Sequence, residues 1–465
     1  MRLVKATGCW LAAWCAIGGA PGGRAAEPGS APTPDCPTAE RVVLTNGQTL
    51  YGLIESKDDA WVHLIQIQRQ PGKMHLVIRP IERGRVASVH GLDETQRAAL
   101  REQIERFRNR AAIEAAHMEA VRLRAAGDGA PARWRYRGKW FDLESSLDEP
   151  TTRRVVVRVE QMCTAYRQVL APRCEPPRAP TVAVYGAMQD YRSHLARLGL
   201  AVQNPACYLP DDNLVLAGSE LNRVAAALAQ LRSQHAQLQK TLREMEKEIE
   251  VRLGEQARRM KREGIAAEQI AKTLARQRQE ADKQLAAKRL EIQRVDRQNE
   301  QQFQQVAGRM FSQLYHEAFH AYLENHVYPR DRFRVPLWLN EGLAQVFESP
   351  SPEPELLRID APNAEMLKRL KKDLAGPAPL LLAELLAADQ AAFLDAERGG
   401  RLYLYAWGLA YYLCFERGLL GSPTLDAYVS ADARPGPAVE RFERLVGAPL
   451  GEFEPQWRQF VAGLK

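Results

Sequence analysis

The chain has 465 residues, of which 45% are hydrophobic and 26% are charged, and its formal net charge is +7. This composition is ordinary for a globular protein of two or three domains, and it excludes a fibrous or wholly disordered chain. The basic excess is local, because residues 219–305 hold 18 Lys and Arg against 13 Asp and Glu. We interpret it as a solvated helical face, with attraction to an anionic envelope surface as the alternative. We expect no nucleic-acid partner.

Residues 1–26 are typical of a secretory signal peptide. A basic start at Arg2 and Lys5 precedes a short apolar run and then small residues. The run is too short for a lasting transmembrane span, although an uncleaved anchor is the alternative. No later segment is a transmembrane candidate, so we expect an exported protein that is periplasmic or extracellular. Residues 27–38 predict a proline-rich, disordered leader.

The cysteines limit what disulfides are feasible. Removal of the signal leaves five: Cys36, Cys163, Cys174, Cys207 and Cys414. An oxidising compartment permits bridges, and Cys163 with Cys174 is the local candidate. The odd number leaves at least one free thiol or an intermolecular bridge, and the pairing stays open.

Residues 39–92 predict a small all-β module. Five short runs with strand character follow one another, and Asn46-Gly47 between the first two is a hairpin turn signal. We expect an SH3-like or Sm-like small β-barrel, because the segment Leu44–Gly52 resembles the L-x-N-G-x-x-x-x-G pattern of such barrels. A structural appendage and a ligand-binding module are both open interpretations.

A helical linker and a mixed segment follow. Residues 93–132 predict a charged linker helix that runs to Ala126, with Asp93 as its N-cap, and a Gly-containing break that is a domain boundary. Residues 133–218 predict the N-terminal part of the next domain. They contain a strand at 140–146, an amphipathic helix, a buried strand at Thr181–Tyr185, a short helix and a strand pair.

Residues 219–305 predict a coiled-coil hairpin. Apolar residues recur at alternating steps of four and three, and Gly264 interrupts the pattern before a second helix begins. Two antiparallel helices of about forty residues would each be ~60 Å long. His235 lies on the seam, where we expect a polar core position rather than a metal ligand. A coiled-coil partner could bind this hairpin. The heptad positions on the first helix are Val224, Leu228, Leu231, His235, Leu238, Leu242, Met245 and Ile249.

The next helix carries the motif His316-Glu317-Ala318-Phe319-His320. Positions i and i+4 lie on one helical face about 6 Å apart, so both imidazoles can bind one tetrahedral Zn²⁺. Glu317 points about 100° away from His316. It therefore cannot be a third ligand, but it can reach a water and act as the general base.

The third metal ligand has two candidates. Glu341 lies on a second apolar helix, where a carboxylate needs a partner that a metal would supply. His326 gives metzincin spacing, but that pattern needs a glycine at position 323, where this chain has Leu323. Without a break, His326 would lie about 9 Å further along the helix axis than His320. We therefore prefer Glu341.

HEAFH followed by VPLWLNEGLAQVF resembles the gluzincins of the MA clan, in particular the bacterial peptidase MA-like families. The resemblance covers roughly 135–218 and 306–463, with the hairpin as an insertion and the β module as an N-terminal addition. It implies an α+β fold: a mainly helical zincin-type metallopeptidase domain with a small sheet. In this fold, residues 306–465 supply the catalytic helices and a helical C-terminal part.

The resemblance also suggests roles for three further positions. Family members often stabilise the oxyanion with a Tyr or His, and Tyr405 is the best match, with Tyr403 as alternate. Thermolysin-type enzymes place an Asp four residues after the glutamate ligand to orient the first histidine. Gln345 occupies that position here and supplies no charge.

Two functions follow. The first is a secreted zinc-dependent peptidase that hydrolyses a protein or peptide substrate, with Zn²⁺ held by His316, His320 and Glu341 and with Glu317 as the base. The second is a non-catalytic envelope scaffold or adaptor, in which the β module and the hairpin bind partners and the metal site is structural or vestigial. Deletion of 219–305 separates them, because a scaffold would lose its partner whereas a peptidase would still cleave small peptides.

Overall fold

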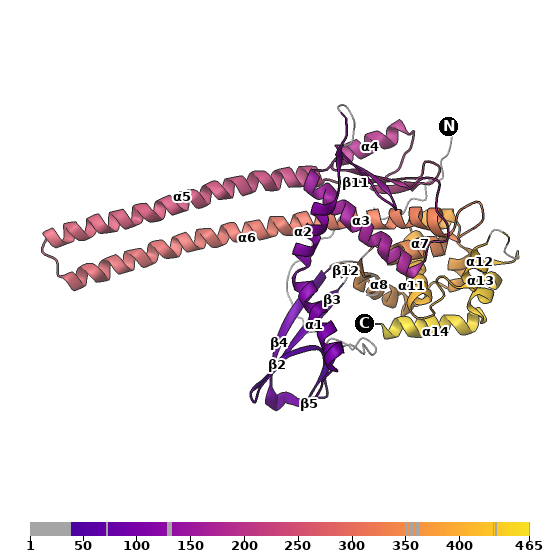
Figure 1. Cartoon of the computed structure of the whole chain (residues 1–465), viewed down its shortest axis with the longest axis horizontal. Helices are drawn as coiled ribbons and strands as arrows, with labels where there is room; N and C mark the ends of the chain where they lie inside the picture. The colour runs from indigo at the N-terminus through magenta and orange to yellow at the C-terminus, as the bar shows by residue number, and fades with distance from the viewer. Residues whose placement is uncertain are drawn as a thin grey trace. The chain divides into compact units, whose positions relative to one another are not determined.

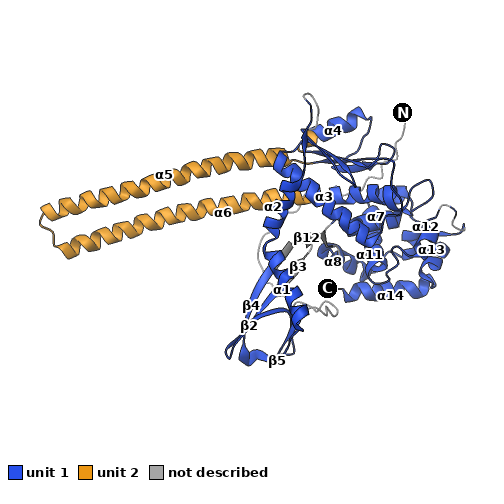
Figure 2. Ribbon diagram, viewed as in Figure 1, with its two compact units in different colours: residues 1–185, 190–218, 311–465 blue, residues 186–189, 219–310 orange. Residues whose placement is uncertain are grey.

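The protein is described from a computed structural model. The predicted signal peptide and leader lie outside the described residues. Two compact units are present, one formed by 186–189 and 219–310 and the other by the rest of the described chain (Figure 2). The residues that the structure describes are 39–70, 73–127, 133–348, 351–352, 357–358, 362–430, 432 and 435–464.

The N-terminal module is an antiparallel sheet of five strands in the order β4-β3-β2-β1-β5. All five predicted strands are present. The predicted hairpin turn at Asn46-Gly47 is confirmed, because Gly47 has φ 82° and donates its N–H to the Leu44 carbonyl at 2.9 Å. The strands are β1 (Glu40–Leu44), β2 (Thr49–Lys57), β3 (Trp61–Gln70), β4 (Lys73–Glu82) and β5 (Val86–His90), with a 3₁₀ turn, η1 (Arg83–Arg85), before β5.

The predicted closed barrel is wrong, because β4 and β5 are the two edges of the sheet and do not pair with each other. Buried apolar side chains of the strands pack against one another in one cluster of the sheet, which includes Val42, Leu50 and Val62. The second face of the sheet is covered by α1 (Glu94–Arg108), whose Leu100 and Ile104 pack on Leu53 and Ile65. A helix therefore covers apolar residues on the second face of the open sheet.

Helix α1 is tied to the sheet by a buried carboxylate. Glu40 is 4% exposed; one of its oxygens lies 3.3 Å from Arg97 Nε and the other accepts the Ile54 N–H. The predicted cap is confirmed, since Asp93 accepts the Gln96 N–H at 2.8 Å. The predicted linker helix is shorter and divided, because α2 (Arg110–Ala120) begins after a break and a strand follows it.

A six-stranded sheet has the order β10-β11-β9-β8-β7-β6, with β8, β9 and β11 parallel and the other neighbours antiparallel. Helix α3 (Glu149–Val169) connects β8 to β9, and α4 (Met188–Arg197) follows β9 (Figure 1). The strands are β6 (Arg124–Ala125), β7 (Trp134–Arg137), β8 (Asp142–Ser145), β9 (Thr181–Tyr185), β10 (Ala206–Leu209) and β11 (Leu214–Gly218). The buried strand β9 and the pair β10–β11 agree with the prediction.

The remaining elements confirm a mixed α+β fold. Helix α6 (Ala267–Tyr322) contributes residues to both units and ends in a π-helical turn, η2 (Leu323–Val327). Tyr166 of α3 donates to the Tyr315 carbonyl at 2.6 Å, which fixes the last turns of α6 against α3. The elements that follow are α7 (Leu337–Val346), β12 (Ser351–Pro352), β13 (Leu357–Arg358), α8 (Ala364–Leu374), α9 (Leu382–Ala387), α10 (Gln390–Leu394), α11 (Gly399–Phe415), α12 (Pro423–Val429), α13 (Ala438–Val446) and α14 (Leu450–Gly463).

The second unit is a helical hairpin, as the heptad pattern predicts. Helix α5 (Leu221–Arg262) and the first part of α6 run antiparallel and are joined by a turn in which Gly264 has φ 77° (Figure 2). Leu242, Leu285 and Ile292 form its buried core. His235 pairs with Asp296 of α6, Nδ1 to Oδ1 at 2.6 Å, so it is a polar seam residue.

The candidate disulfide is not formed. Cys163 and Cys174 are both free thiols, as are Cys207 and Cys414. Cys163 is a buried residue of α3, whereas the Cys174 thiol donates a hydrogen bond to the Asn325 carbonyl at 3.4 Å. Separately, none of the helices in the described ranges combines the length and apolar character needed to cross a bilayer.

Candidate metal centre

The last turns of α6 bury two histidines on one face. His316 and His320 are 2% and 1% exposed, and their ring centroids lie 4.8 Å apart at an interplanar angle of 79°. The apolar neighbours Leu314 and Phe319 are fully buried, which explains why this part of α6 lies in the core. The spacing of four residues therefore places both imidazoles side by side in a water-poor environment.

Helix α7 brings a carboxylate to the two rings. Glu341 is 2% exposed, with Oε2 3.3 Å from His316 Nε2 and Oε1 3.8 Å from His320 Nε2. The approach of α7 depends on Gly342, because a Cβ there would lie 2.3 Å from the Ala406 carbonyl oxygen of α11. Close packing of α7 on α11 thus accompanies the placement of Glu341 beside the histidines.

These three side chains could hold a metal ion. One donor atom from each lies within 4.8 Å of the others. Ligand atoms that bind a tetrahedral Zn²⁺ at 2.0–2.1 Å lie ~3.3 Å from one another. The distance of 3.3 Å between His316 Nε2 and Glu341 Oε2 fits this spacing. Burial lowers the pKa of His320 to about 4, so this imidazole is neutral and keeps a lone pair for a metal. Its Nε2 atom has no hydrogen-bond partner among the described residues.

Two residues that the sequence analysis did not identify orient the histidines. Glu348 Oε1 lies 2.6 Å from Nδ1 of His316, and Asn340 Oδ1 lies 3.0 Å from Nδ1 of His320. Both contacts direct Nε2 of each ring toward the centre of the group. Gln345, which was expected near His316, is buried with no hydrogen bond to its side-chain oxygen. Glu348 follows Glu341 by seven residues in the sequence, but it lies beyond the end of α7 at Val346, so helical spacing alone does not place it beside His316.

Glu317 lies beside this group and is 3% exposed. Burial raises the pKa of its carboxyl to about 7, and the negative charges of Glu341 and Glu348 act in the same direction. His316 and the backbone N–H of Tyr208 oppose the rise. The carboxyl thus has a pKa close to neutrality, as a group that exchanges protons at neutral pH requires.

The Tyr208 N–H belongs to β10, an edge strand of the six-stranded sheet. The Pro205 carbonyl accepts from Gly218 at 2.6 Å, so alternation along the strand turns the N–H and C=O of Ala206 and Tyr208 away from β11. The edge of β10 that does not pair with β11 therefore lies beside Glu317, with all four residues of the strand buried and the Tyr208 N–H facing the Glu317 carboxyl.

The other candidate residues make contacts with side chains outside the group of His316, His320 and Glu341. His326 lies in the π-helical turn, where its ring packs on Trp140 and Tyr322 with centroids at 5.2 Å and 5.4 Å. The Tyr405 hydroxyl donates to Asp373 of α8 at 2.6 Å, and its ring packs on Trp457 of α14. These contacts give no support to Tyr405 as an oxyanion stabiliser. The alternate, Tyr403, packs edge-on against Phe393.

A comparison with protein families matches residues 310–418 to a family described as a protein of unknown function, DUF1570. The matched segment contains His316, Glu317, His320, Glu341 and Glu348. It includes neither the β module nor the turn of the hairpin. No curated protein was found to match the chain.

Proposed function

We propose that the protein is a zinc-dependent peptidase of the gluzincin type. The observation that carries the proposal is the buried group of His316, His320 and Glu341 with the carboxyl of Glu317 beside it. Two imidazoles and one carboxylate are a donor set that catalytic zinc sites use, with the fourth position left for water or substrate. Sites for softer metal ions use thiolate or thioether ligands, and sites for Mg²⁺ or Ca²⁺ use oxygen ligands alone.

The proposed chemistry divides between the ion and the protein. A bound zinc ion would supply a Lewis acid that activates water and polarises a carbonyl group. Glu317 would accept the proton of the attacking water and return it to the departing amine. A carboxyl with a pKa of about 7 is suited to both transfers, because it neither holds nor releases its proton too strongly. Glu348 and Asn340 would hold the ligand imidazoles in orientation.

The edge strand favours a peptide as the substrate. An extended peptide can add to an exposed strand edge through backbone hydrogen bonds. Ala206 and Tyr208 turn such groups away from β11 and toward Glu317, although β10 is buried. A peptide that displaced the contact between Tyr208 and Glu317 and paired with β10 would pass the base. We therefore propose an extended segment of a protein or peptide as the substrate class.

The test is a metal measurement paired with a protease assay on the full exported chain. The expected result is one zinc ion per molecule in the wild type and loss of zinc in Glu341→Ala. Glu317→Gln should retain the zinc, but its rate of hydrolysis of a mixed peptide library should fall by at least about 100-fold, the scale of general-base catalysis. Glu397→Gln, an exposed acid on another part of the surface, is the matched control and should change neither.

Three outcomes would contradict the proposal. Wild-type protein without stoichiometric zinc would remove its basis. Stoichiometric zinc with equal hydrolysis by the wild type and Glu317→Gln would show that the carboxyl has no catalytic role. Zinc without any hydrolysis would instead favour the scaffold function with a structural metal.

A further inference from the structure

The basic excess of the hairpin is confined to one end. We define the tip as residues 252–278, which comprise about three turns of α5, the turn at Gly264 and about three turns of α6. The tip holds 8 Lys and Arg against 3 Asp and Glu, whereas the rest of 219–305 holds 10 of each. The long arms of the hairpin are therefore neutral as a whole, and its net positive charge belongs to the tip.

Most of the tip cations are not neutralised by a neighbour. Three of the eight pair with glutamates: Arg252 with Glu248, Arg259 with Glu263 and Arg278 with Glu250. The other five are exposed and have no ion pair among the described residues; they are Arg258, Lys261, Arg262, Lys272 and Arg276. Only two acids of the tip, Glu255 and Glu268, are likewise unpaired. The tip therefore presents an excess of unpaired positive charge to solvent.

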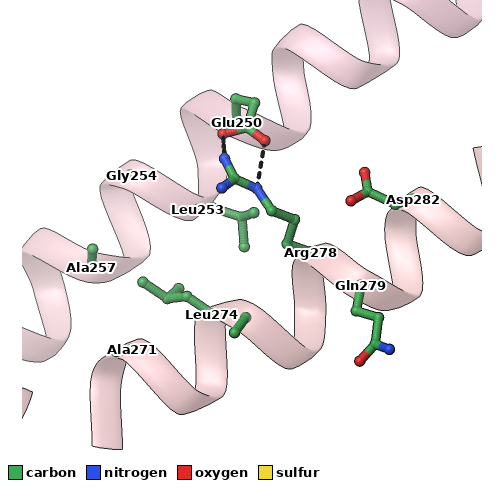
Figure 3. A pocket seen from close by; sticks show the side chains of 10 residues that line it. Glu250, Leu253, Gly254, Ala257, Ala271, Leu274, Arg278, Gln279 and Asp282 are labelled. Atoms are coloured by element: carbon green, nitrogen blue, oxygen red, sulfur yellow. Dashed lines mark hydrogen bonds and ion pairs between the residues drawn. The ribbon is translucent and has the colours of Figure 1, made fainter. Parts of the chain in front are cut away.

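The base of the tip shows how the hairpin neutralises a cation elsewhere. Arg278 of α6 reaches across to α5, where its Nε donates to Oε1 of Glu250 at 2.9 Å (Figure 3). The pair borders a pocket between the helices that includes the small residues Gly254 and Ala257. Three further ion pairs cross between the arms, but none of the described pairs does so closer to the turn than Arg278. Toward the turn, the cations are therefore open to a partner.

We propose that the tip binds the surface of a membrane that contains anionic lipids. Clusters of about four to eight Lys and Arg bind such surfaces through their charge, and each cation near the surface strengthens binding roughly fivefold. Four of the five unpaired cations, all except Arg276, lie within ~8 Å of the helix ends at Arg262 and Ala267. This is about one Debye length, so these four act together when the turn meets the surface.

The arrangement of the cations favours lipid headgroups over an acidic protein. At 100° per residue, Arg258 and Arg262 lie about 60° and 100° from Lys261 around α5, and Lys272 adds a cation on the second helix. The cations thus point to more than one side of the tip. One rigid protein face could contact only one of these sides, whereas mobile headgroups can gather around the whole end.

An acidic band on α5 fixes the direction of approach. Glu244, Glu246, Glu248 and Glu250 precede the tip, and an anionic surface would repel them. They lie ~18–27 Å from the end of α5, so a surface that touches the turn is more than a Debye length away from them. A hairpin that lay flat would bring these acids to the surface. The tip should therefore bind end-on.

The binding should be electrostatic and reversible. The apolar residues nearest the turn, Met260, Ile265 and Ile270, are half-buried, and none of the exposed large hydrophobic side chains of the described chain lies in the tip. The tip thus lacks the exposed apolar face with which amphipathic helices enter a bilayer. Screening of the charges by salt should then release the protein from the surface.

Co-sedimentation of the full chain with vesicles tests the proposal. The probes are vesicles of phosphatidylcholine alone and of phosphatidylcholine with about 30% phosphatidylglycerol, at about 0.05 M and about 0.5 M salt. We expect binding to the anionic vesicles at low salt and its loss at high salt. The triple variant Arg258→Gln, Lys261→Gln and Arg262→Gln should bind about 100-fold more weakly. The matched control removes the same charge from exposed positions of α5 outside the tip and should bind as the wild type does; it is Lys240→Gln, Arg243→Gln and Lys247→Gln.

Absence of binding to the anionic vesicles, or equal binding to both kinds of vesicle, would overturn the proposal. So would an unchanged affinity of the tip variant or an equal loss in the control. Binding of polyglutamate in place of the anionic vesicles would show that the tip recognises an acidic polypeptide instead, which also overturns it. Circular dichroism should show the same helix content in all three proteins, and their zinc content should be equal, so the result depends neither on folding defects nor on the peptidase function.

Discussion

Glu348 lies 2.6 Å from Nδ1 of His316, and the two residues come from sequence positions 32 apart. A carboxylate at this distance fixes the Nδ1–H tautomer, so that the lone pair of Nε2 faces Glu341. The interaction supplies the negative charge that Gln345 cannot supply at the position where thermolysin-type enzymes carry an Asp.

Replacement of Glu348 should weaken zinc binding. We expect Glu348→Ala to raise the dissociation constant for zinc by 10–100-fold, the range usual for residues that orient a metal ligand. Glu348→Gln should have a smaller effect, because an amide oxygen still accepts the N–H but carries no charge. Competition with a zinc chelator measures both. Gln345→Ala is the control and should bind zinc as tightly as the wild type does. If Glu348→Ala also binds zinc as tightly as the wild type, Glu348 does not orient His316.

The buried carboxyl of Glu317 should make the metal-free protein less stable at higher pH. Its pKa is about 7 in the folded state against an ordinary value of 4.5. Between these values the folded protein keeps a proton that the unfolded chain releases, so stability falls as pH rises from 4.5 to 7. The cost above pH 7 is roughly 3 kcal/mol.

Glu317→Gln removes this cost, because an amide does not ionise. The lowered pKa of His320 makes stability rise with pH between about 4 and 6.5, but this contribution is present in both proteins. We therefore expect chelator-treated Glu317→Gln and wild type to have similar unfolding free energies near pH 4.5. The variant should be more stable at pH 8. Urea unfolding at the two pH values measures the difference, and a constant difference would refute the assigned pKa.

The sequence predicted the features that depend on local periodicity. The heptad rows predicted α5 and the hairpin, and the period-two runs predicted β1 to β5. The spacing of His316 and His320 predicted their common face. The group with Glu341 was also anticipated, because a carboxylate among apolar residues needs a partner.

The errors have a common physical cause, since each depends on contacts between distant segments. Strand β7 was missed although Trp134 and Tyr136 alternate with Arg135 and Arg137, because it has only four residues and is defined by its pairing with β6 and β8. The open sheet depends on how α1 packs, which strand patterns do not report. Glu348 was missed because its role requires the end of α7 to approach α6.

The cysteines should differ sharply in reactivity. Burial raises the pKa of Cys207 and of Cys414 to about 12, so neither forms a thiolate at pH 8. Burial raises the pKa of Cys163 as well. Cys174 and Cys414 are both partly exposed, but the raised pKa of Cys414 keeps its thiol protonated. Cys174 is therefore the thiol of these four that we expect iodoacetamide to modify in the native protein.

Peptide mapping after labelling at pH 8 measures this order. Cys174→Ser should remove the native label from these four positions, and denaturation should expose the other three. A disulfide between Cys163 and Cys174 in the mapped peptides would contradict the free thiols of the structure.

The contact between α7 and α11 should be intolerant of even one added methyl group. A Cβ at Gly342 would lie 2.3 Å from the Ala406 carbonyl oxygen and 2.9 Å from the Ala410 Cβ. We expect Gly342→Ala to destabilise the protein by about 1–3 kcal/mol, the usual cost of overpacking, and to weaken zinc binding because Glu341 precedes it on α7. Thermal unfolding with and without zinc measures both effects.

Gly400→Ala is the matched control for that substitution. Gly400 lies in α11 as well, but a Cβ there meets nothing within 4 Å. Alanine has the better helix propensity, so this variant should gain up to about 1 kcal/mol and keep its zinc affinity. Equal behaviour of the two variants would show that α7 and α11 are not packed as closely as the position of Glu341 requires. In that case the carboxylate would have to reach the histidines from a different placement of α7.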